Sequence, residues 1–272
     1  MYKLVVSDLD GTLLGPDHRL GDYTRAVLAR LRDAGVELVL ASGRHYMDVR
    51  ALSAQLGAEG CLITCNGAAV NDGTGALVQS QSLDPDAVRF LVRDPLFSDV
   101  HTNVFLTDAW LVEQAEPSLL RYHQDSGFHY HVVDFSALTR PDVLKVFYYG
   151  EHDHLVRLEA AIIDRIGAQV GTTFSLPQTL EVMAAGITKG AALSLLLADR
   201  GLTPADALCV GDGLNDLEML SLVAEGGGTS LLMANADPRL HADLPQLEVI
   251  GSNASQAVAR RLERLLEAGE LA

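Results

Sequence analysis

The chain has 272 residues, of which 48% are hydrophobic and 21% charged, enough to bury one large core or two modest ones. Its formal net charge of −16 argues against nucleic-acid binding, because phosphate backbones are bound by clustered Lys and Arg. No apolar run approaches the roughly 18 residues of a membrane span, and the first residues do not resemble an export signal. Composition therefore predicts a cytoplasmic globular protein with neither nucleic acid nor membrane as partner.

The first part of the chain alternates short apolar runs with amphipathic stretches. Strands are expected at 3–7, 36–41 and 61–65, and helices at 23–34 and 46–56, with Gly35 and Gly57 as helix stops. Strands that alternate with helices are typical of a parallel sheet. The near-continuous Val, Leu and Ile content of these strands indicates a sheet covered on both faces.

The middle of the chain loses this strict alternation. Strand-like pieces are expected at 100–106, 109–114, 143–150, 167–175 and 179–184, and helices at 85–94, 117–124 and 152–167. Such a mixture predicts an α+β module. Turn-forming residues mark its edges, with Pro85 at the start and Gly186 at the end. We therefore expect an inserted domain at residues 84–185.

The last part returns to the first rhythm, with helices at 189–200, 214–224 and 255–268 and strands at 206–211, 230–235 and 247–251. Residues 1–83 and 186–272 together thus predict one doubly wound, Rossmann-like α/β core. Cys61, Cys65 and Cys209 lie in apolar strand-like runs, which favours buried thiols over disulfides or a zinc site.

Polar residues follow the core strands at four places. In open α/β sheets, ligands bind outside the carboxyl ends of the strands, so these residues are candidates for a shared site. They are Asp8 and Asp10 after the first strand, Ser42 and Gly43 after the second, Lys189 at a helix start, and Asp212, Asn215 and Asp216 after 206–211. Carboxylate oxygens suit Mg²⁺, and a lysine at a helix N-terminus suits a phosphate.

Each motif also has an ordinary structural interpretation. Asp8 and Asp10 could form an Asx turn, Ser42 could cap a helix, and Asn215 or Asp216 could shape a tight turn. Lys189 could be a solvated surface lysine. The functional interpretation is favoured because all four places fall at strand exits or helix starts of one α/β pattern.

These motifs resemble those of haloacid dehalogenase superfamily phosphatases, of the Cof-type group (subfamily IIB). "DLDGTLL" resembles the first motif, "ASGR" the end of the second, "ITKGAAL" the third and "GDGLNDLEML" the fourth, in order and over essentially the whole chain. The resemblance implies that residues 84–185 are a C2-type cap, inserted between the second and third motifs, that closes over the site and selects the leaving group.

The resemblance also implies a role for each candidate residue. Asp8 is expected to be the nucleophile and Asp10 the general acid and base. Mg²⁺ is expected to be bound by Asp8, the backbone carbonyl of Asp10, Asp212 and, directly or through water, Asp216. The phosphoryl group is expected to contact Ser42, Gly43, Lys189 and Asn215, with Asn66 in "CNGAAV" as a further substrate contact.

The function predicted from this pattern is Mg²⁺-dependent hydrolysis of small phosphomonoesters through an aspartyl-phosphate. Sugar phosphates are the first expected substrates, and phosphorylated cofactors such as pyridoxal phosphate or FMN the alternative. A phosphomutase and a non-catalytic module that keeps phosphate on Asp8 remain open. Cap residues that could contact the leaving group are His101, Asn103, Glu113, Arg121, Tyr122 and a group of histidines, His123, His129, His131, His152 and His154.

Overall fold

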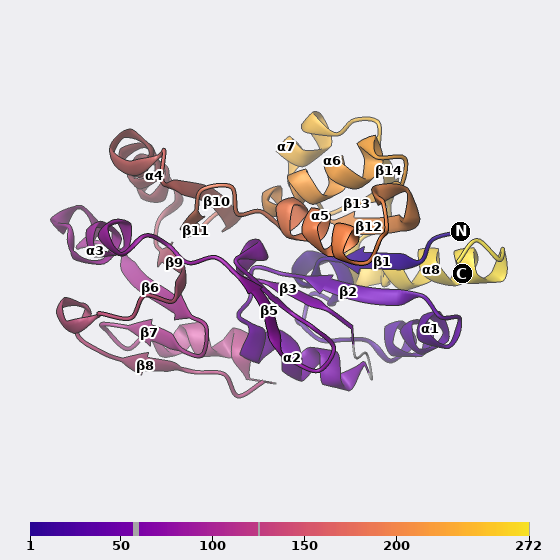
Figure 1. The fold of residues 1–272 in the computed structure, drawn as a ribbon, viewed down its shortest axis with the longest axis horizontal. Coiled ribbons are helices and arrows are strands. Elements are labelled where there is room, and N and C mark those ends of the chain that lie inside the picture. Colours follow the sequence, from indigo (N-terminus) through magenta and orange to yellow (C-terminus); the bar gives the residue numbers. More distant parts are fainter. Residues whose placement is uncertain (57–59, 125, 272) are drawn as a thin grey trace.

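The computed structural model describes residues 1–56, 60–124 and 126–271, so Gly57 lies outside the described residues, as does the side chain of Tyr122. The chain forms two lobes, each built on one β-sheet (Figure 1). Within the described residues, none of the helices is both long and apolar enough to span a bilayer.

The larger sheet has eight strands in the order β14-β13-β12-β1-β2-β3-β4-β5. Its parallel strands are β1 (Leu4–Ser7), β2 (Glu37–Ala41), β3 (Leu62–Thr64), β12 (Ala207–Gly211), β13 (Thr229–Met233) and β14 (Glu248–Ile250). The short strands β4 (Ala69–Asn71) and β5 (Leu77–Ser80) are antiparallel additions at one edge. The parallel part confirms the predicted doubly wound core.

Helices cover both faces of this sheet, as the apolar strands indicated. The side chains of β1 alternate between the faces: Val5 belongs to one apolar cluster, and Leu4 and Val6 belong to the other. The first cluster includes residues of α1 (Asp22–Asp33), α2 (Tyr46–Gln55) and α8 (Ala257–Glu267), and the second includes residues of α5 (Lys189–Asp199), α6 (Leu217–Glu225) and α7 (Pro238–Asp243). Figure 1 shows the second group of helices on the opposite side of the sheet from α1 and α8.

The smaller sheet has six strands in the order β10-β11-β9-β6-β7-β8, and all of its pairs are antiparallel except β7 with β8. Its strands are β6 (His101–Leu106), β7 (Trp110–Val112), β8 (Tyr130–Val132), β9 (Val143–Tyr149), β10 (Val170–Leu176) and β11 (Thr179–Ala184). The helices α3 (Pro85–Arg93) and α4 (His152–Ile166) cover one face. The other face carries a second apolar cluster, which includes residues next to the core loops.

The smaller sheet and its two helices fall inside residues 84–185, and we keep these limits as the proposed boundaries of the cap.

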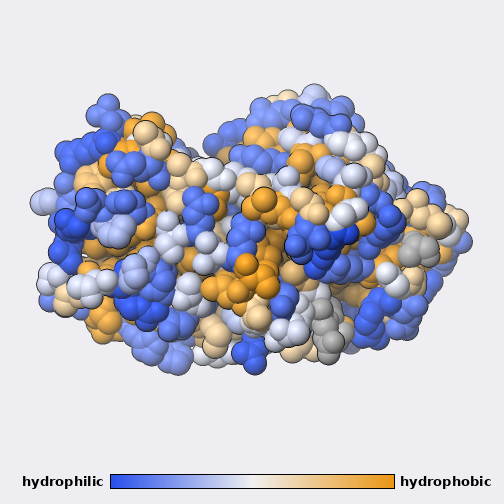
Figure 2. All heavy atoms as spheres, viewed as in Figure 1, coloured by the Kyte–Doolittle hydropathy of each residue, from blue (hydrophilic) through white to orange (hydrophobic). Residues whose placement is uncertain are grey.

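The space-filling view shows mostly hydrophilic side chains on both lobes and a group of hydrophobic side chains near the middle of the molecule (Figure 2). Leu77 and Val78 of the edge strand β5 are 46% and 58% exposed. The carboxyl ends of β1 and β12 face the cap, and this edge holds the candidate site.

Candidate active site

Asp8 lies directly after β1, at the centre of the core sheet. This is where the strand order reverses, because β1 is flanked by β2 on one side and β12 on the other. The Nζ atom of Lys189 lies 2.5 Å from Asp8 Oδ1 and 2.7 Å from Asp216 Oδ1. Lys189 is 0% exposed, which excludes the surface interpretation of this lysine. The first residue of α5 thus places a buried ammonium between two carboxylates.

Asp212 follows β12 and completes a group of three carboxylates. Asp8, Asp212 and Asp216 each offer an oxygen, and the three oxygens lie within 4.8 Å of one another. Thr12 Oγ1 donates to Asp212 Oδ1 at 2.6 Å. Gly11 has a φ of +82°, and a Cβ there would lie 2.1 Å from Asp212 Oδ2, so the turn after Asp10 accepts no larger residue.

This group carries more negative charge than Lys189 offsets. Three carboxylates and one ammonium leave two formal negative charges in a buried site. Burial raises the pKa of Asp8, against the lowering effect of Lys189, and the charges of Asp216 and Asp212 raise it further. Burial and the charge of Asp216 raise the pKa of Asp212 to about 7. A divalent cation with a preference for oxygen ligands, such as Mg²⁺, fits this donor set.

Asp216 also shapes the turn in which it lies. Its Oδ2 accepts hydrogen bonds from the backbone N–H groups of Asp212, at 3.0 Å, and Gly213, at 2.9 Å. The turn interpretation and the site interpretation of "GDGLND" are therefore both correct. One carboxylate oxygen holds the loop, and the other faces Lys189.

Asp10 points away from the three-carboxylate group and toward Arg44. Arg44 donates to both carboxylate oxygens of Asp10, each at 2.6 Å, and His18 Nδ1 lies 2.8 Å from Asp10 Oδ1. Burial acts to raise the pKa of Asp10, but the hydrogen bonds from His18 and Arg44 outweigh it and lower the pKa well below its usual range. Asp10 is thus held as a carboxylate.

Arg44 connects Asp10 to the cap through Asp48. Arg44 Nη1 lies 2.9 Å from Asp48 Oδ2, and Asp48 is 1% exposed. Two cap groups reach the same carboxylate: Ser126 donates its hydroxyl to Oδ1, and His123 Nδ1 lies 3.1 Å from Oδ2. The cap therefore contacts a chain of charges that ends at Asp10.

The remaining predicted residues lie at the same edge of the core sheet. Ser42 is 1% exposed, and its Oγ accepts from the backbone N–H of Arg44 at 3.1 Å. Asn215 Nδ2 donates to Asn66 Oδ1 at 3.0 Å. Gly43 adjoins this pair, because a Cβ on Gly43 would lie 2.9 Å from Asn66 Oδ1. The structure thus brings all the predicted site residues to one region, while their catalytic roles stay predictions.

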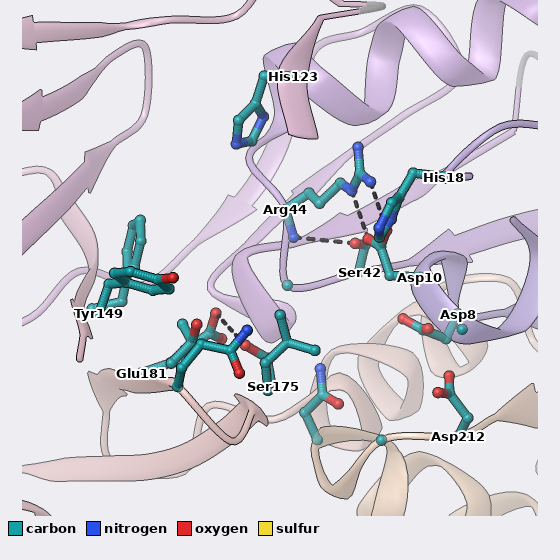
Figure 3. Close-up of a pocket in the computed structure, with 18 of the residues that line it drawn as sticks. Asp8, Asp10, His18, Ser42, Arg44, His123, Tyr149, Ser175, Glu181 and Asp212 are labelled. Carbon is teal, nitrogen blue, oxygen red and sulfur yellow. Dashed lines mark hydrogen bonds and ion pairs between the residues drawn. The ribbon is translucent and has the colours of Figure 1, made fainter. Parts of the chain in front are cut away.

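A cavity of about 370 Å³ lies between this edge of the core and the cap. Figure 3 shows Asp8 and Asp212 on one side of it and Tyr149, Glu181 and Ser175 of the cap on the other. Its cap wall is largely apolar, built from Phe105, Trp110, Leu119, Phe147 and Tyr149. The polar cap groups that line it are His123, Lys145, Ser175, Gln178, Thr179 and Glu181.

Most of the cap residues singled out from the sequence do not line this cavity. His101 Nε2 contacts the backbone oxygen of Gln114, and Asn103 is buried and accepts from Trp110 Nε1 at 3.0 Å. Neither these residues nor Glu113 and Arg121 line the large cavity. Of the histidines, His123 does line it. Among the described residues, Asp8, Asp212 and Asp216 form the one group suited to metal binding, so the histidines do not form another.

Four important groups were not identified from the sequence: the side chains of Arg44 and His18 beside Asp10, and Lys145 and Glu181 in the cap. A signal existed for Lys145. Lysine occurs only three times in the chain, and Lys145 interrupts the apolar strand-like run "VLKVFYY". A charged residue inside a buried strand requires a partner, which here is Glu181.

Comparison with known proteins identifies the family to which this chain belongs. The model of the haloacid dehalogenase-like hydrolase family matches residues 5–262, so the chain belongs to this family. It is 40% identical over 267 residues to an HMP-PP phosphatase of Serratia proteamaculans, covering 98% of this chain and 96% of that protein. It is 38% identical over 271 residues to an HMP-PP phosphatase of Yersinia pestis, covering 100% and 98%.

Solved structures agree with this assignment. A haloacid dehalogenase-like hydrolase from Bacteroides thetaiotaomicron matches with a TM-score of 0.85 at 26% identity, over 97% of this chain and all of that one. A sugar phosphatase of HAD subclass IIB matches with a TM-score of 0.82 over 97% and 98%, and its 18% identity supports the fold alone. The chain is therefore an enzyme of the phosphatase type with a Rossmann-like core and a cap, as its motifs predicted.

Proposed function

We propose that this protein is a Mg²⁺-dependent phosphatase in which Asp8 attacks the terminal phosphorus atom of a small substrate. The observation that carries this proposal is the placement of Asp8 at the cavity floor, with Lys189 at 2.5 Å and Asp212 beside it. A carboxylate can act as a nucleophile toward phosphorus, and a buried cation stabilises the negative charge of the transition state. The phosphoryl group then resides on Asp8 until water removes it.

Mg²⁺ would be held by Asp8, Asp212 and Asp216, with the backbone carbonyl of Asp10 as a proposed further ligand. When bound, it supplies positive charge that offsets repulsion between the carboxylates and the phosphate. Lys189 contributes a second positive charge at the N-terminus of α5, where backbone N–H groups also favour an anion. Ser42, the N–H of Gly43 and Asn215 are proposed to donate hydrogen bonds to phosphate oxygens.

Asp10 is proposed to take a proton from the attacking water and to protonate the leaving oxygen. The contacts with Arg44 and His18 keep it as a carboxylate, which is the form that accepts a proton from water. The protonated form, needed for the acid step, requires these contacts to loosen. The chain of charges from the cap through Asp48 and Arg44 reaches Asp10 and can influence this step.

The cap wall and the relatives together favour a leaving group with a flat ring. Four aromatic side chains line the cavity, and such rings stack on flat groups. The two relatives described above, at 38% and 40% identity over nearly the full chain, are named HMP-PP phosphatases. We therefore propose HMP-PP as the first substrate, with pyridoxal phosphate and FMN next, and place sugar phosphates after them.

A panel of phosphate esters tests this proposal. Phosphate release from HMP-PP, pyridoxal phosphate, FMN and several sugar phosphates is measured with added Mg²⁺, and again with EDTA. We expect the highest kcat/KM for HMP-PP and loss of activity in EDTA that Mg²⁺ restores. Full activity in EDTA or in Asp8→Asn would overturn the mechanism. Isomerised sugar phosphates without phosphate release would indicate a mutase, and a stable phosphoprotein would indicate a non-catalytic module.

A further inference from the structure

A buried ion pair in the cap reaches the core loops of the active site. Lys145 of β9 and Glu181 of β11 are 2% and 4% exposed, and Lys145 Nζ lies 2.8 Å from Glu181 Oε1. Ser175 donates to the same oxygen at 3.0 Å. The ammonium also lies about 5 Å from the ring centroids of Phe105 and Phe147, at 5.0 and 5.1 Å. Both charges thus lie in the cavity wall with several partners.

The pair continues into the core at two points. Lys145 Nζ donates to the carbonyl oxygen of Gly43 at 2.7 Å. Glu181 Oε2 accepts from Asn66 Nδ2, and Asn66 Oδ1 in turn accepts from Asn215 Nδ2. The hydrogen-bonded chain therefore runs from the cap strands to the loop after β12.

The contact with Gly43 acts on Ser42 through one peptide group. The carbonyl that accepts from Lys145 and the N–H of Arg44 belong to the same planar peptide, and they point in opposite directions. That N–H donates to Ser42 Oγ at 3.1 Å. Since Ser42 Oγ accepts this bond, its own hydrogen points away from the peptide and is available to the phosphate. Lys145 therefore fixes the plane that sets the direction of the Ser42 hydroxyl.

Stability alone does not account for this ion pair. Removing two charges from water costs several kcal/mol each, and well-packed apolar residues of similar size often replace a buried pair without loss of stability. The cavity-facing side of β9 is otherwise aromatic, with Phe147 and Tyr149, so an apolar pair would suit it. Lys145 and Glu181 make hydrogen bonds to Gly43 and Asn66 that apolar side chains could not make.

We propose that Lys145 and Glu181 are positioning residues: from the cap, they set the orientation of Ser42 and of the Asn66–Asn215 pair in the core. The phosphate site is then complete only when the cap rests on the core. This inference depends on the proposed phosphatase activity. It differs from a role in substrate selection, because it predicts the same loss for every phosphoryl donor, whether or not the donor fills the aromatic cavity.

The test is a double-mutant cycle between Ser42→Ala and the cap pair. The pair is removed as Lys145→Met with Glu181→Leu, so that no unpaired charge stays buried. The kcat and KM are measured with HMP-PP, which carries the proposed ring, and with acetyl phosphate, which does not. The inhibition constant of inorganic phosphate reports binding at the phosphate site. The matched control is Arg165→Met with Asp94→Leu, an ion pair at the cap surface.

We expect the cap double variant to lose roughly tenfold in kcat on both substrates and to bind inorganic phosphate more weakly. In the Ser42→Ala background the same change should cost less, because the hydroxyl that Lys145 orients is then absent and only the effect on the Asn66–Asn215 pair remains. The control variant should keep its activity. Circular dichroism and the thermal midpoint verify folding, and if the double variant does not fold, Lys145→Gln with Glu181→Gln takes its place in the cycle.

Additive losses in the cycle, or a loss confined to HMP-PP, would overturn the positioning role. Failure of the proposed function gives a different result, because the unmodified protein would then release no phosphate from either donor.

Discussion

The two sides of the cavity carry different kinds of side chains. The core edge brings together four carboxylates: Lys189 contacts Asp8 and Asp216, Arg44 contacts Asp10, and Thr12 donates to Asp212. The cap side presents four aromatic side chains together with polar groups and one buried ion pair. Charges at such short distances depend on exact geometry, so the core edge tolerates little change, whereas an apolar wall accepts substitution at a modest cost. We therefore propose that the core edge performs the chemistry, and that the cap selects the leaving group and, through Lys145 and Glu181, helps to orient the phosphate site.

The largest effect is expected at the core edge. Asp8→Asn should lower kcat by about 10⁴-fold or more, because the amide is not a nucleophile toward phosphorus. The rate of phosphate release measures this. Asp206→Asn is the matched control, since Asp206 is paired with Lys3 at the surface. An Asp8→Asn protein with a tenth of the normal rate would contradict the assignment of the chemistry to this edge.

A histidine at the seam between the lobes should make stability depend on pH. His45 of the core is 0% exposed; its Nε2 lies 2.8 Å from the carbonyl oxygen of Leu106 in the cap, and its Nδ1 accepts from Met47 N. The two partners require the neutral ring. Burial lowers the pKa of His45 to about 4, below its ordinary value of 6.5.

The unfolded chain therefore binds the proton more readily than the folded one. The free energy of unfolding should fall as the pH is lowered from about 6.5 to 4, by about 3 kcal/mol in total from this residue. Urea denaturation at several pH values measures it, and His45→Gln should remove this part of the pH dependence. The exposed His152→Gln serves as control. Equal slopes for the unmodified protein and His45→Gln would exclude this role.

Asp48 tests whether the cap influences the core chemistry through Arg44. Asp48→Asn removes one of the two negative partners of Arg44, and we expect kcat to fall by roughly tenfold, with a changed pH dependence of kcat and a smaller change in KM. Asp86→Asn, which removes an exposed partner of Arg89, is the control. An unchanged pH profile would show that Asp10 is independent of Asp48.

The smallest effect is expected in the aromatic wall. Tyr149→Leu should raise KM for HMP-PP by about threefold to tenfold, because one stacking partner is lost, and should leave the hydrolysis of acetyl phosphate unchanged. Phe90→Leu is the matched control, because Phe90 packs on the helix-covered face of the cap. Equal losses on both substrates would contradict the separation of chemistry from selection.

The core site could be predicted from the sequence because the position of each residue follows from the strand or helix next to it in the chain. Each candidate residue of the core lies just after a strand or near the start of a helix, and the parallel order brings those positions to one edge. Asp8 and Asp212 are some two hundred residues apart, yet both follow adjacent strands. The strands that were not predicted are β4, β5 and β8, with three or four residues each; β4 and β5 pair antiparallel at the sheet edge, outside the alternation of strands and helices.

The cap wall could not be predicted, because it depends on strand register. Lys145 lies opposite Phe105, and Glu181 opposite Phe147, in an antiparallel sheet whose pairing shifts between Phe105 and Leu106. A shift of one residue moves a side chain to the other face of a sheet. His101 and Asn103 show a second limit, because they pair with Tyr149 and Phe147 of the cavity wall but do not line the cavity themselves.

The central claim is that Asp8 carries the phosphoryl group, and one measurement tests it most directly. The Asp10→Asn protein, in which removal of the phosphoryl group should be slow, is mixed with HMP-PP and Mg²⁺ and quenched in acid within the first turnover. Mass spectrometry of its peptides should show one added phosphoryl group on Asp8, which is absent when Asp8 is also replaced by Asn. Substrate turnover without any phosphorylated Asp8, or a phosphoryl group on another residue, would contradict the account.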